Sequence, residues 1–502
     1  MNDKTPNEKK EATDHQAAIP LYYQIKEHIK LAIQNGQYQP GQRLPTEEAL
    51  CKRYKVSRIT VRRALAELSQ EGLLSSMQGS GTYVNDYSYL RVVTLKAMVT
   101  EASWVAPLQQ AVALYNGVHP GHHLKLDVAV VGRPQLRFKL VAAVAQGEAP
   151  DLALIDWVWM PEFAKRRYLQ PLDEIDPAWV HALQADLYPV FVERNTYGKH
   201  FYGVQTEANV AVLWYRADLL RQEGIEPPRT WKELVSCALH FKQQVVRETY
   251  SLGNYPLVFP AGLKAGETTT YQFLAFVWAA NGELMQQGKV VLGQPVIEAL
   301  EFLKSLVHTH HVTPPDVVTY TWVDAPKRFA QGKAVFAISG SYDKSLIQEI
   351  AGWDESTFKD KVGFVPIPAA ERGQQATTAG GIMYALFRQS KHLQQALELL
   401  KAVASPDVML EFCLRSGRKP TRISVAQALH PERDWFLHHT SKLLDIAKIR
   451  PSIPEYAQIS VQLRALLETV MTCDLSPDQA VQNAQLIIDA LTRYPEEDTL
   501  QG

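Results

Sequence analysis

Cysteine is scarce in this chain, with four in 502 residues. The four are far apart and none forms a Cys-x-x-Cys pair, so we expect neither a disulfide framework nor a structural zinc site. The formal net charge of −1 gives the whole chain no bias toward nucleic acid. No stretch approaches the roughly 20 apolar residues of a membrane span. Residues 1–18 lack the apolar core of a secretory signal, which predicts a cytoplasmic protein.

A chain of this length is too long for one core and predicts several domains. We expect residues 1–17 to be a disordered tail and residues 18–85 to form the first domain. Apolar side chains recur at helical spacing after Pro20, namely Tyr22, Ile25, Ile29 and Ile33. Thr46 and Ser57 each precede a helical pattern and are predicted N-caps.

The helix that follows Ser57 has the pattern of a DNA-recognition helix. Val61, Leu65 and Leu68 would face the core, which leaves Arg58 and Arg62 on the outward side. Residues near the N-terminus of a recognition helix reach base edges, and Arg suits bidentate contact with guanine. Glycines at 79 and 81 permit a tight turn between two strands, so residues 18–85 predict a winged helix-turn-helix.

Charge is concentrated in this segment. Between Ile19 and Val84 nine Lys and Arg residues face five Glu residues, a difference of +4. A basic patch on one short module is the electrostatic signature of DNA binding.

Four motifs in order make residues 19–84 similar to the DNA-binding domain of the GntR family of bacterial transcription regulators. They are PLYYQI at 20–25, PGQRLPTE at 40–47, SRITVR at 57–62 and GSGT at 79–82. The resemblance implies operator DNA as a partner and a homodimer. The candidate DNA-binding residues are Arg43, Thr46, Ser57, Arg58, Thr60, Arg62 and Gly79.

Residues 86–91 read as a linker, and residues 92–99 as a strand. Strand and amphipathic-helix patterns then alternate to about residue 491, which predicts an α/β architecture in two lobes. Four motifs extend the pattern, namely APDLALIDWVW at 149–159, LWYRADLL at 213–220, PRTWKEL at 228–234 and FAQGKA at 329–334.

In their shared order, these motifs resemble the solute-binding proteins of sugar ABC importers, of the maltose-binding-protein type. The resemblance covers residues 92–495. It implies a two-lobed α/β fold, with the first lobe at about 92–205 and 375–425 and the second at about 206–370 and 426–495. The ligand is expected in the cleft between the lobes, which close by a hinge motion. The fold class is therefore multidomain, a winged helix followed by a two-lobed periplasmic-binding-protein-like domain.

Aromatic and carboxylate side chains suit a sugar, because rings cover its C–H faces and carboxylates bind its hydroxyls. Asp156 follows a predicted strand and lies beside two tryptophans, and ligands of α/β sheets bind beyond the carboxyl ends of strands. The resemblance adds positions from the second lobe and a glycine pair. The candidate ligand-binding residues are Trp104, Asp156, Trp157, Trp159, Asn209, Trp322, Tyr342, Gly380 and Gly381.

We therefore expect a cytoplasmic, ligand-responsive transcription regulator that binds a sugar, with no enzymatic activity, no cofactor and no metal. Two alternatives stay open. One is a GntR-headed regulator with an aminotransferase-like body that uses pyridoxal phosphate, although the chain lacks the Ser-x-x-Lys context of such bodies. The other is a plain solute-binding component of a transporter.

Overall fold

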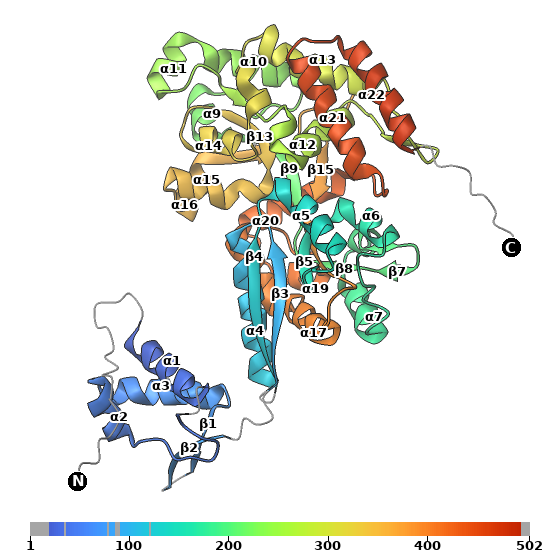
Figure 1. Ribbon diagram of the computed structural model, residues 1–502. Helices are drawn as coiled ribbons and strands as arrows, with labels where there is room; N and C mark the ends of the chain where they lie inside the picture. The colour runs from blue at the N-terminus through green and yellow to red at the C-terminus, as the bar shows by residue number, and fades with distance from the viewer. Residues whose placement is uncertain (1–19, 35–36, 78–79, 86–90, 120–121, 493–502) are drawn as a thin grey trace, which may run out of the picture. The chain divides into compact units, whose positions relative to one another are not determined.

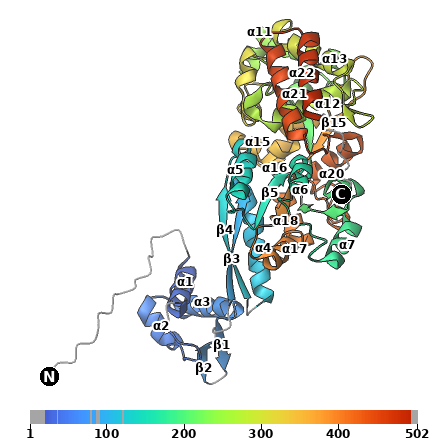
Figure 2. The ribbon, with the colours of Figure 1, turned by 45° about the vertical axis from the view of Figure 1, so that its right-hand side comes forward.

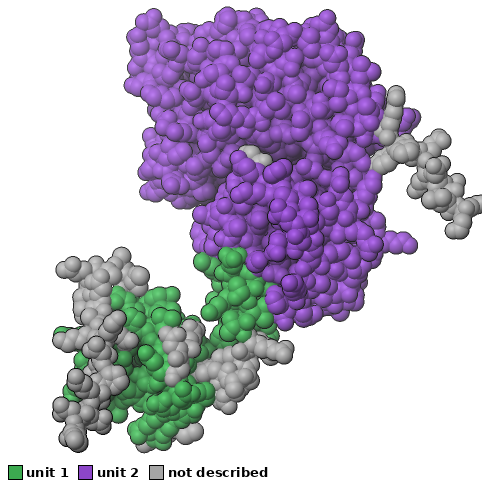
Figure 3. Space-filling view, in the orientation of Figure 1, with its two compact units in different colours: residues 1–95, 109–127 green, residues 96–108, 128–502 purple. Residues whose placement is uncertain are grey.

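The computed structural model describes residues 20–34, 37–77, 80–85, 91–119 and 122–492. The chain divides into two compact units, residues 1–95 with 109–127 and residues 96–108 with 128–502 (Figure 3). The division falls inside strand β3 (Arg91–Val99). Residues 86–90 of the predicted linker lie outside the described residues, and its last residue, Arg91, is the first residue of β3. The predicted tail at 1–17 lies outside the described residues.

The first unit contains a three-helix domain with a β-hairpin. Its elements are α1 (Leu21–Gln34), α2 (Glu47–Tyr54), α3 (Arg58–Gln70), β1 (Leu74–Met77) and β2 (Gly81–Val84). Ile25, Val61 and Leu68 are fully buried in one small core with Val84. The hairpin is antiparallel, with Leu74 opposite Val84. This is the predicted winged helix-turn-helix, held by apolar faces that repeat every three to four residues.

Both predicted N-caps of this domain are confirmed. The Thr46 hydroxyl accepts a hydrogen bond from the amide of Ala49, and the Ser57 hydroxyl accepts one from the amide of Thr60, each at 3.3 Å. Each bond satisfies a backbone donor that the first helical turn leaves unpaired.

The first lobe of the following domain is built on a five-stranded sheet. Its strand order is β4 (His122–Val130), β3, β5 (Leu152–Asp156), β16 (Ile382–Leu386) and β8 (Gly203–Gln205). A small antiparallel hairpin, β6 (Thr196–Tyr197) and β7 (His200–Phe201), directly precedes β8 in the sequence. The helices that alternate with these strands are α4 (Val105–Val118), α5 (Arg133–Ala145), α6 (Met160–Lys165), α7 (Pro177–Asp186), α8 (Pro189–Arg194), α17 (Leu393–Val403), α18 (Pro406–Ser416) and α19 (Ile423–Gln427).

The second lobe is built on a mixed sheet (Figure 1). Its order is β10 (Leu257–Val258), β13 (Phe336–Gly340), β9 (Asn209–Arg216), β15 (Thr377–Gly380) and β17 (Ala447–Ile449), and β14 (Val362–Val365) also pairs with β9. A hairpin joins β11 (Met285–Gln286) to β12 (Lys289–Val290). The helices are α9 (Ala217–Glu223), α10 (Trp231–Lys242), α11 (Gln244–Tyr250), α12 (Glu267–Ala279), α13 (Gln294–His308), α14 (Asp324–Ala330), α15 (Lys344–Ala351), α16 (Glu355–Lys361), α20 (Trp435–Lys442), α21 (Tyr456–Met471) and α22 (Pro477–Thr492).

The main core of this lobe surrounds α12, whose residues from Thr268 to Ala279 are all buried. Helix α12 packs against β15 on the sheet and against α21, and Figures 1 and 2 both show these elements side by side. A helix that is buried all round has no charged face, and after Glu267 this helix carries no charge, although its first turn holds three threonines.

The chain crosses between the lobes at residues 206–208, at Gly381 and between α19 and α20. The first lobe was expected to resume at about residue 375. Instead β15 pairs with β9 and β17 of the second lobe, so the second crossing comes at Gly381. Hydroxyl groups hold β15 there, because Thr377 donates to the carbonyl of Ala211 and Thr378 to the carbonyl of Tyr271.

Candidate functional site

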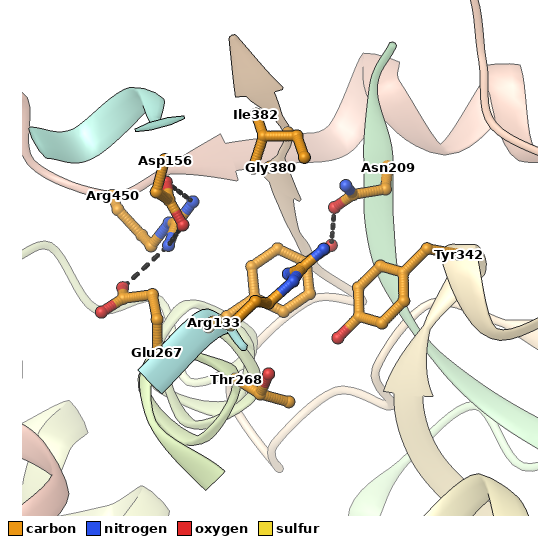
Figure 4. A pocket seen from close by; sticks show the side chains of 11 residues that line it. Arg133, Asp156, Asn209, Glu267, Thr268, Tyr342, Gly380, Ile382 and Arg450 are labelled. Atoms are coloured by element: carbon orange, nitrogen blue, oxygen red, sulfur yellow. Dashed lines mark hydrogen bonds and ion pairs between the residues drawn. The ribbon is translucent and has the colours of Figure 1, made fainter. Parts of the chain in front are cut away.

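Two cavities meet beside the crossing segments, and side chains of both lobes line them. The inner one is small and lies against the glycine pair at 380–381 (Figure 4). The outer one has a volume of about 370 Å³, which falls in the range of small-molecule sites. Both cavities share Arg133, Asp156, Glu267, Thr268 and Ile382. We treat them as one binding cavity with an inner and an outer end.

Each shared residue sits at an end of a secondary-structure element. Asp156 is the last residue of β5, and Arg133 and Glu267 are the first residues of α5 and α12. In an α/β sheet the loops beyond the strand ends form the natural place for a ligand. The fold therefore collects these charged side chains from three separate segments of the chain at the same opening.

A buried arginine joins the two lobes at the inner end. Nη2 of Arg450 lies 3.1 Å from Oδ1 of Asp156, and Nη1 lies 2.8 Å from Oε1 of Glu267 (Figure 4). Tyr456 and Ser460 also donate hydrogen bonds to Glu267, at 2.7 and 2.5 Å. Only 2 % of the Arg450 side chain is exposed. Arg133 also lines this end, so two carboxylates and two guanidinium groups offer both acceptors and donors of hydrogen bonds to a ligand.

Burial raises the pKa of Asp156, and Glu267 adds to the rise, while Arg450 opposes it. Asp343, one residue beyond the cavity-lining Tyr342, is also buried. Burial raises its pKa to about 7, although hydrogen bonds from Ser339 and from the backbone of Gly340 favour the charged form. A desolvated carboxyl group resists ionisation unless a counter-charge compensates it.

Glu207 fixes the backbone at the crossing. Its Oε1 accepts a hydrogen bond from the amide of Ile382 at 3.0 Å, and its Oε2 accepts one from the Asn209 side chain at 3.3 Å. Burial raises the pKa of this carboxyl group. The Asn209 oxygen accepts a bond from the Tyr271 hydroxyl at 2.9 Å. Asn209 is therefore already held on both sides, and one N–H of its amide is left for a ligand.

The structure brings together seven of the nine sequence-predicted ligand residues. Asp156, Asn209, Tyr342, Gly380 and Gly381 line the inner end, and Trp159 and Trp322 line the outer end with Asp156. Lining a cavity does not test binding, so their role as ligand contacts stays a prediction.

Trp104 and Trp157 line neither end. Trp104 is fully buried against Phe412, with ring centroids 4.6 Å apart, and Arg418 lies over its ring. Trp157 is 2 % exposed, and the guanidinium groups of Arg194 and Arg450 each lie 5.3 Å from the centre of one of its rings. The chain turns into a 3-10 helix directly after Asp156, which directs Trp157 into the core and Trp159 toward the cavity. Only tertiary structure distinguishes these tryptophans.

Sequence reasoning missed the charged residues of the cavity other than Asp156. Arg133, Glu267 and Arg450 belong to none of the family-like motifs, and Arg450 is 294 residues from its partner Asp156. One usable signal was local, since Arg133 follows a strand and a glycine, the place where α/β sheets put ligand contacts.

The recognition helix α3 presents its predicted DNA contacts to solvent. The Arg58 and Arg62 side chains are 68 % and 60 % exposed. Both donate to the carboxylate of Glu47, at 2.6 and 3.0 Å. Hydrogen bonding to Arg58 is the main cause that lowers the pKa of Glu47. This carboxylate holds two guanidinium groups one helical turn apart.

The other predicted DNA contacts are spread around this face. Arg43, Ser57 and Thr46 are exposed, and Thr60 is partly exposed. A side chain at Gly81 of the hairpin would collide with Arg43, so the wing and this arginine pack closely. Gly79 lies outside the described residues. DNA contact by these residues stays a prediction.

Two family models match the chain. Residues 99–410 match the bacterial extracellular solute-binding proteins, and residues 21–84 match the bacterial regulatory proteins of the gntR family. The first match covers more than half of the chain. The chain belongs to the bacterial extracellular solute-binding protein family and carries a gntR-type DNA-binding domain. This confirms both resemblances and the two-part fold.

Each individual relative matches one of these two parts of the chain. A putative binding protein of Brucella abortus is 25% identical over 384 residues, 76% of this chain and 88% of that protein. The mannosyl-D-glycerate transport/metabolism system repressor MngR of Escherichia coli is 51% identical over 67 residues, 13% of this chain and 28% of the repressor. The solved structure of maltose-bound MalE3 of T. maritima is 26% identical, with a TM-score of 0.70 over 80% of this chain and 100% of MalE3.

Both families consist of binding proteins, so the chain is a gntR-type DNA-binding regulator fused to a solute-binding domain, not an enzyme. The aminotransferase-like alternative is wrong, because the body is a solute-binding domain. Among the described residues, no cluster of three or more His, Cys, Asp or Glu side chains could hold a metal ion. No helix in the described part of the chain is long and apolar enough to cross a membrane.

Proposed function

We propose that this protein is a sugar-responsive transcription regulator of the cytoplasm. In this proposal, its gntR-type domain binds operator DNA, and its solute-binding domain binds a sugar in the cavity between the lobes. The observation that carries the proposal is the fusion of an exposed recognition helix to a two-lobed domain with a charged and aromatic cavity.

The chemistry of the cavity supports a sugar. Trp159 and Trp322 offer ring faces at the outer end, and Asp156 and Glu267 offer carboxylates. Rings and carboxylates are the groups that sugar C–H faces and hydroxyls contact best. Similarity supports it too, since MalE3 is described with maltose bound and MngR as the repressor of a mannosyl-D-glycerate system.

The position of the crossings supports a mechanism. Glu207 bonds to the backbone of Ile382, so two crossing segments are tied together beside the cavity. A ligand that touches both lobes favours one lobe arrangement by its differential affinity alone. In a homodimer, such a change would alter the spacing of two DNA-binding domains on a palindromic operator. A DNA-binding function supports a cytoplasmic location over the alternative of a transporter component.

Thermal unfolding of the full chain tests the sugar assignment against mono-, di- and oligosaccharides. A ligand that binds only the native state, at 100 times its Kd, should add about 2.7 kcal/mol to stability. The Asp156→Asn variant should lose that gain. Asp186→Asn should keep it, because Asp186 does not line the cavity. A panel of sugars without any effect on the wild-type chain would contradict the proposal.

A further inference from the structure

The outer end of the cavity is lined by more arginines than carboxylates. Arg133, Arg137 and Arg464 line it, against Asp156 and Glu267. The two carboxylates already bind Arg450, and Arg133 is paired with Glu101 at 3.0 Å. The question that remains is which groups balance the positive charges of Arg137 and Arg464.

Neither arginine has a carboxylate of its own. Arg137 shares Glu162 with Arg166, at 2.6 and 3.3 Å, so two guanidinium groups divide one negative charge. Nε of Arg464 donates to the carbonyl of Ser460 at 3.1 Å. Within the described ranges of the chain, the structure pairs Arg464 with no carboxylate. The outer end thus carries positive charge that the protein itself does not balance.

The two ends of the cavity differ in charge. At the inner end Asp156 and Glu267 face Arg450 and Arg133, so the charges there balance and the carboxylate oxygens can accept hydrogen bonds from hydroxyl groups. Arg137 and Arg464 line only the outer end. A ligand that satisfies both ends has hydroxyl groups at one side and an anionic group at the other.

The apolar part of the lining fits the same ligand. Phe138, Leu263 and Val461 line the outer end although they are 75%, 43% and 41% exposed. With the two tryptophans, they offer an apolar surface to the C–H face of a sugar ring. An inorganic anion alone would leave this apolar surface uncovered.

We propose that the ligand is an anionic sugar, a hydroxylated ring with a phosphate or carboxylate group that Arg137 and Arg464 bind together. This inference rests on the proposed function, because it names the ligand class for the same cavity. Arginine binds such oxygens through two parallel N–H groups. Arg137 belongs to α5 of the first lobe and Arg464 to α21 of the second. One anion would bridge the lobes through charge-assisted hydrogen bonds, which are stronger than the bonds that the hydroxyl groups of a neutral sugar would make with the same residues.

Binding of matched ligand pairs tests the inference on the full chain. Calorimetry would compare glucose, galactose, mannose and N-acetylglucosamine with their 6-phosphates and with the corresponding uronic acids, and inorganic phosphate would serve as the control for charge alone. We expect one anionic member to bind at least tenfold more tightly than its neutral parent and than phosphate. The phosphate and uronate arms show which anion the site takes.

Variants that remove one charge then show which residues bind the anionic group. Arg464→Gln and Arg137→Gln should each lower the affinity for the anionic sugar about tenfold or more, and Arg464→Lys should restore part of it. Arg166→Gln is the matched control, because Arg166 pairs with the same Glu162 but does not line the cavity. It should leave the affinity within about twofold.

Three results would overturn the inference. If a neutral sugar binds as tightly as its anionic forms, the anion site is wrong and the proposed sugar sensor stands. If the Arg464→Gln and Arg137→Gln variants keep the preference for the anionic sugar, other groups bind the anion. If neither neutral nor anionic sugars bind, the inference and the proposed function fail together.

Discussion

At the scale of single residues, Glu47 links the two arginines that we expect to contact DNA. It accepts hydrogen bonds from Arg58 and Arg62, which restricts both side chains before DNA arrives. Removing either arginine takes away a charge and a fork of donors from the exposed face of α3.

We predict that Arg58→Ala and Arg62→Ala each weaken operator binding roughly tenfold or more. Arg63→Ala is the matched control. Arg63 is 62% exposed on the same helix but pairs with Glu67 and lies 3.8 Å from the centre of the Tyr22 ring. Fluorescence anisotropy with an operator duplex, selected from a random pool, measures all three. Equal losses for Arg63→Ala and Arg62→Ala would show that charge alone acts.

Asp343 predicts a pH dependence of stability. Its pKa in the folded state is raised to about 7, above the ordinary value of 3.8 that applies to the unfolded chain. Between these values the folded chain holds a proton that the unfolded chain releases. Stability from this group is therefore greatest at low pH and falls as pH rises toward 7.

The side chain of the Asp343→Asn variant cannot ionise, so the variant does not lose stability in this way as pH rises. We expect its stability relative to wild type to rise by up to about 1.4 kcal/mol per pH unit between pH 4 and 7, and to level off above. Urea unfolding at pH 5, 6, 7 and 8 measures the difference. A difference that stays constant with pH would contradict the raised pKa.

At the scale of secondary-structure elements, Gly381 separates a strand of one lobe from a strand of the other. Its φ is +156°, and an added Cβ would lie 2.1 Å from Nε2 of Gln205 and 2.8 Å from the carbonyl oxygen of Glu207. A side chain here must displace the crossing segment at 206–208. The crossing therefore requires glycine for space as well as for backbone conformation.

We predict that Gly381→Ala lowers stability by about 1–3 kcal/mol and weakens ligand binding. Gly288→Ala provides the control, because Gly288 has a φ of +77° but open space where the Cβ would go. It should cost about 1 kcal/mol from backbone strain and leave ligand affinity unchanged. Denaturant unfolding and calorimetry separate the two effects. Equal behaviour of the two variants would contradict a special role for the crossing.

Sequence alone predicted the features that depend on neighbours in the chain. The caps at Thr46 and Ser57, the apolar face of α3 and the strand that ends at Asp156 are local patterns, and the structure contains them. The crossing at Gly381 was misplaced by several residues because strand pairing is not local. The ion pairs of Arg450 and the burial of Trp104 depend on contacts between distant segments, which no spacing reveals.

At the scale of the whole molecule, the account joins two binding activities in one chain. A solute-binding domain changes the affinity of a DNA-binding domain only if its ligand has different affinities for two states of the protein. Linkage then requires that DNA and ligand alter each other's binding by the same factor. Without this coupling, the chain would contain two independent binding proteins.

The most direct measurement is the affinity of the full chain for its operator, with and without the ligand that stabilises it. We predict a change of at least fivefold in Kd at constant salt. Asp156→Asn should abolish this change but keep DNA binding without ligand, because Asp156 lies in the solute-binding domain. If a saturating ligand leaves the operator affinity unchanged, the proposal that this protein is a ligand-responsive regulator is contradicted.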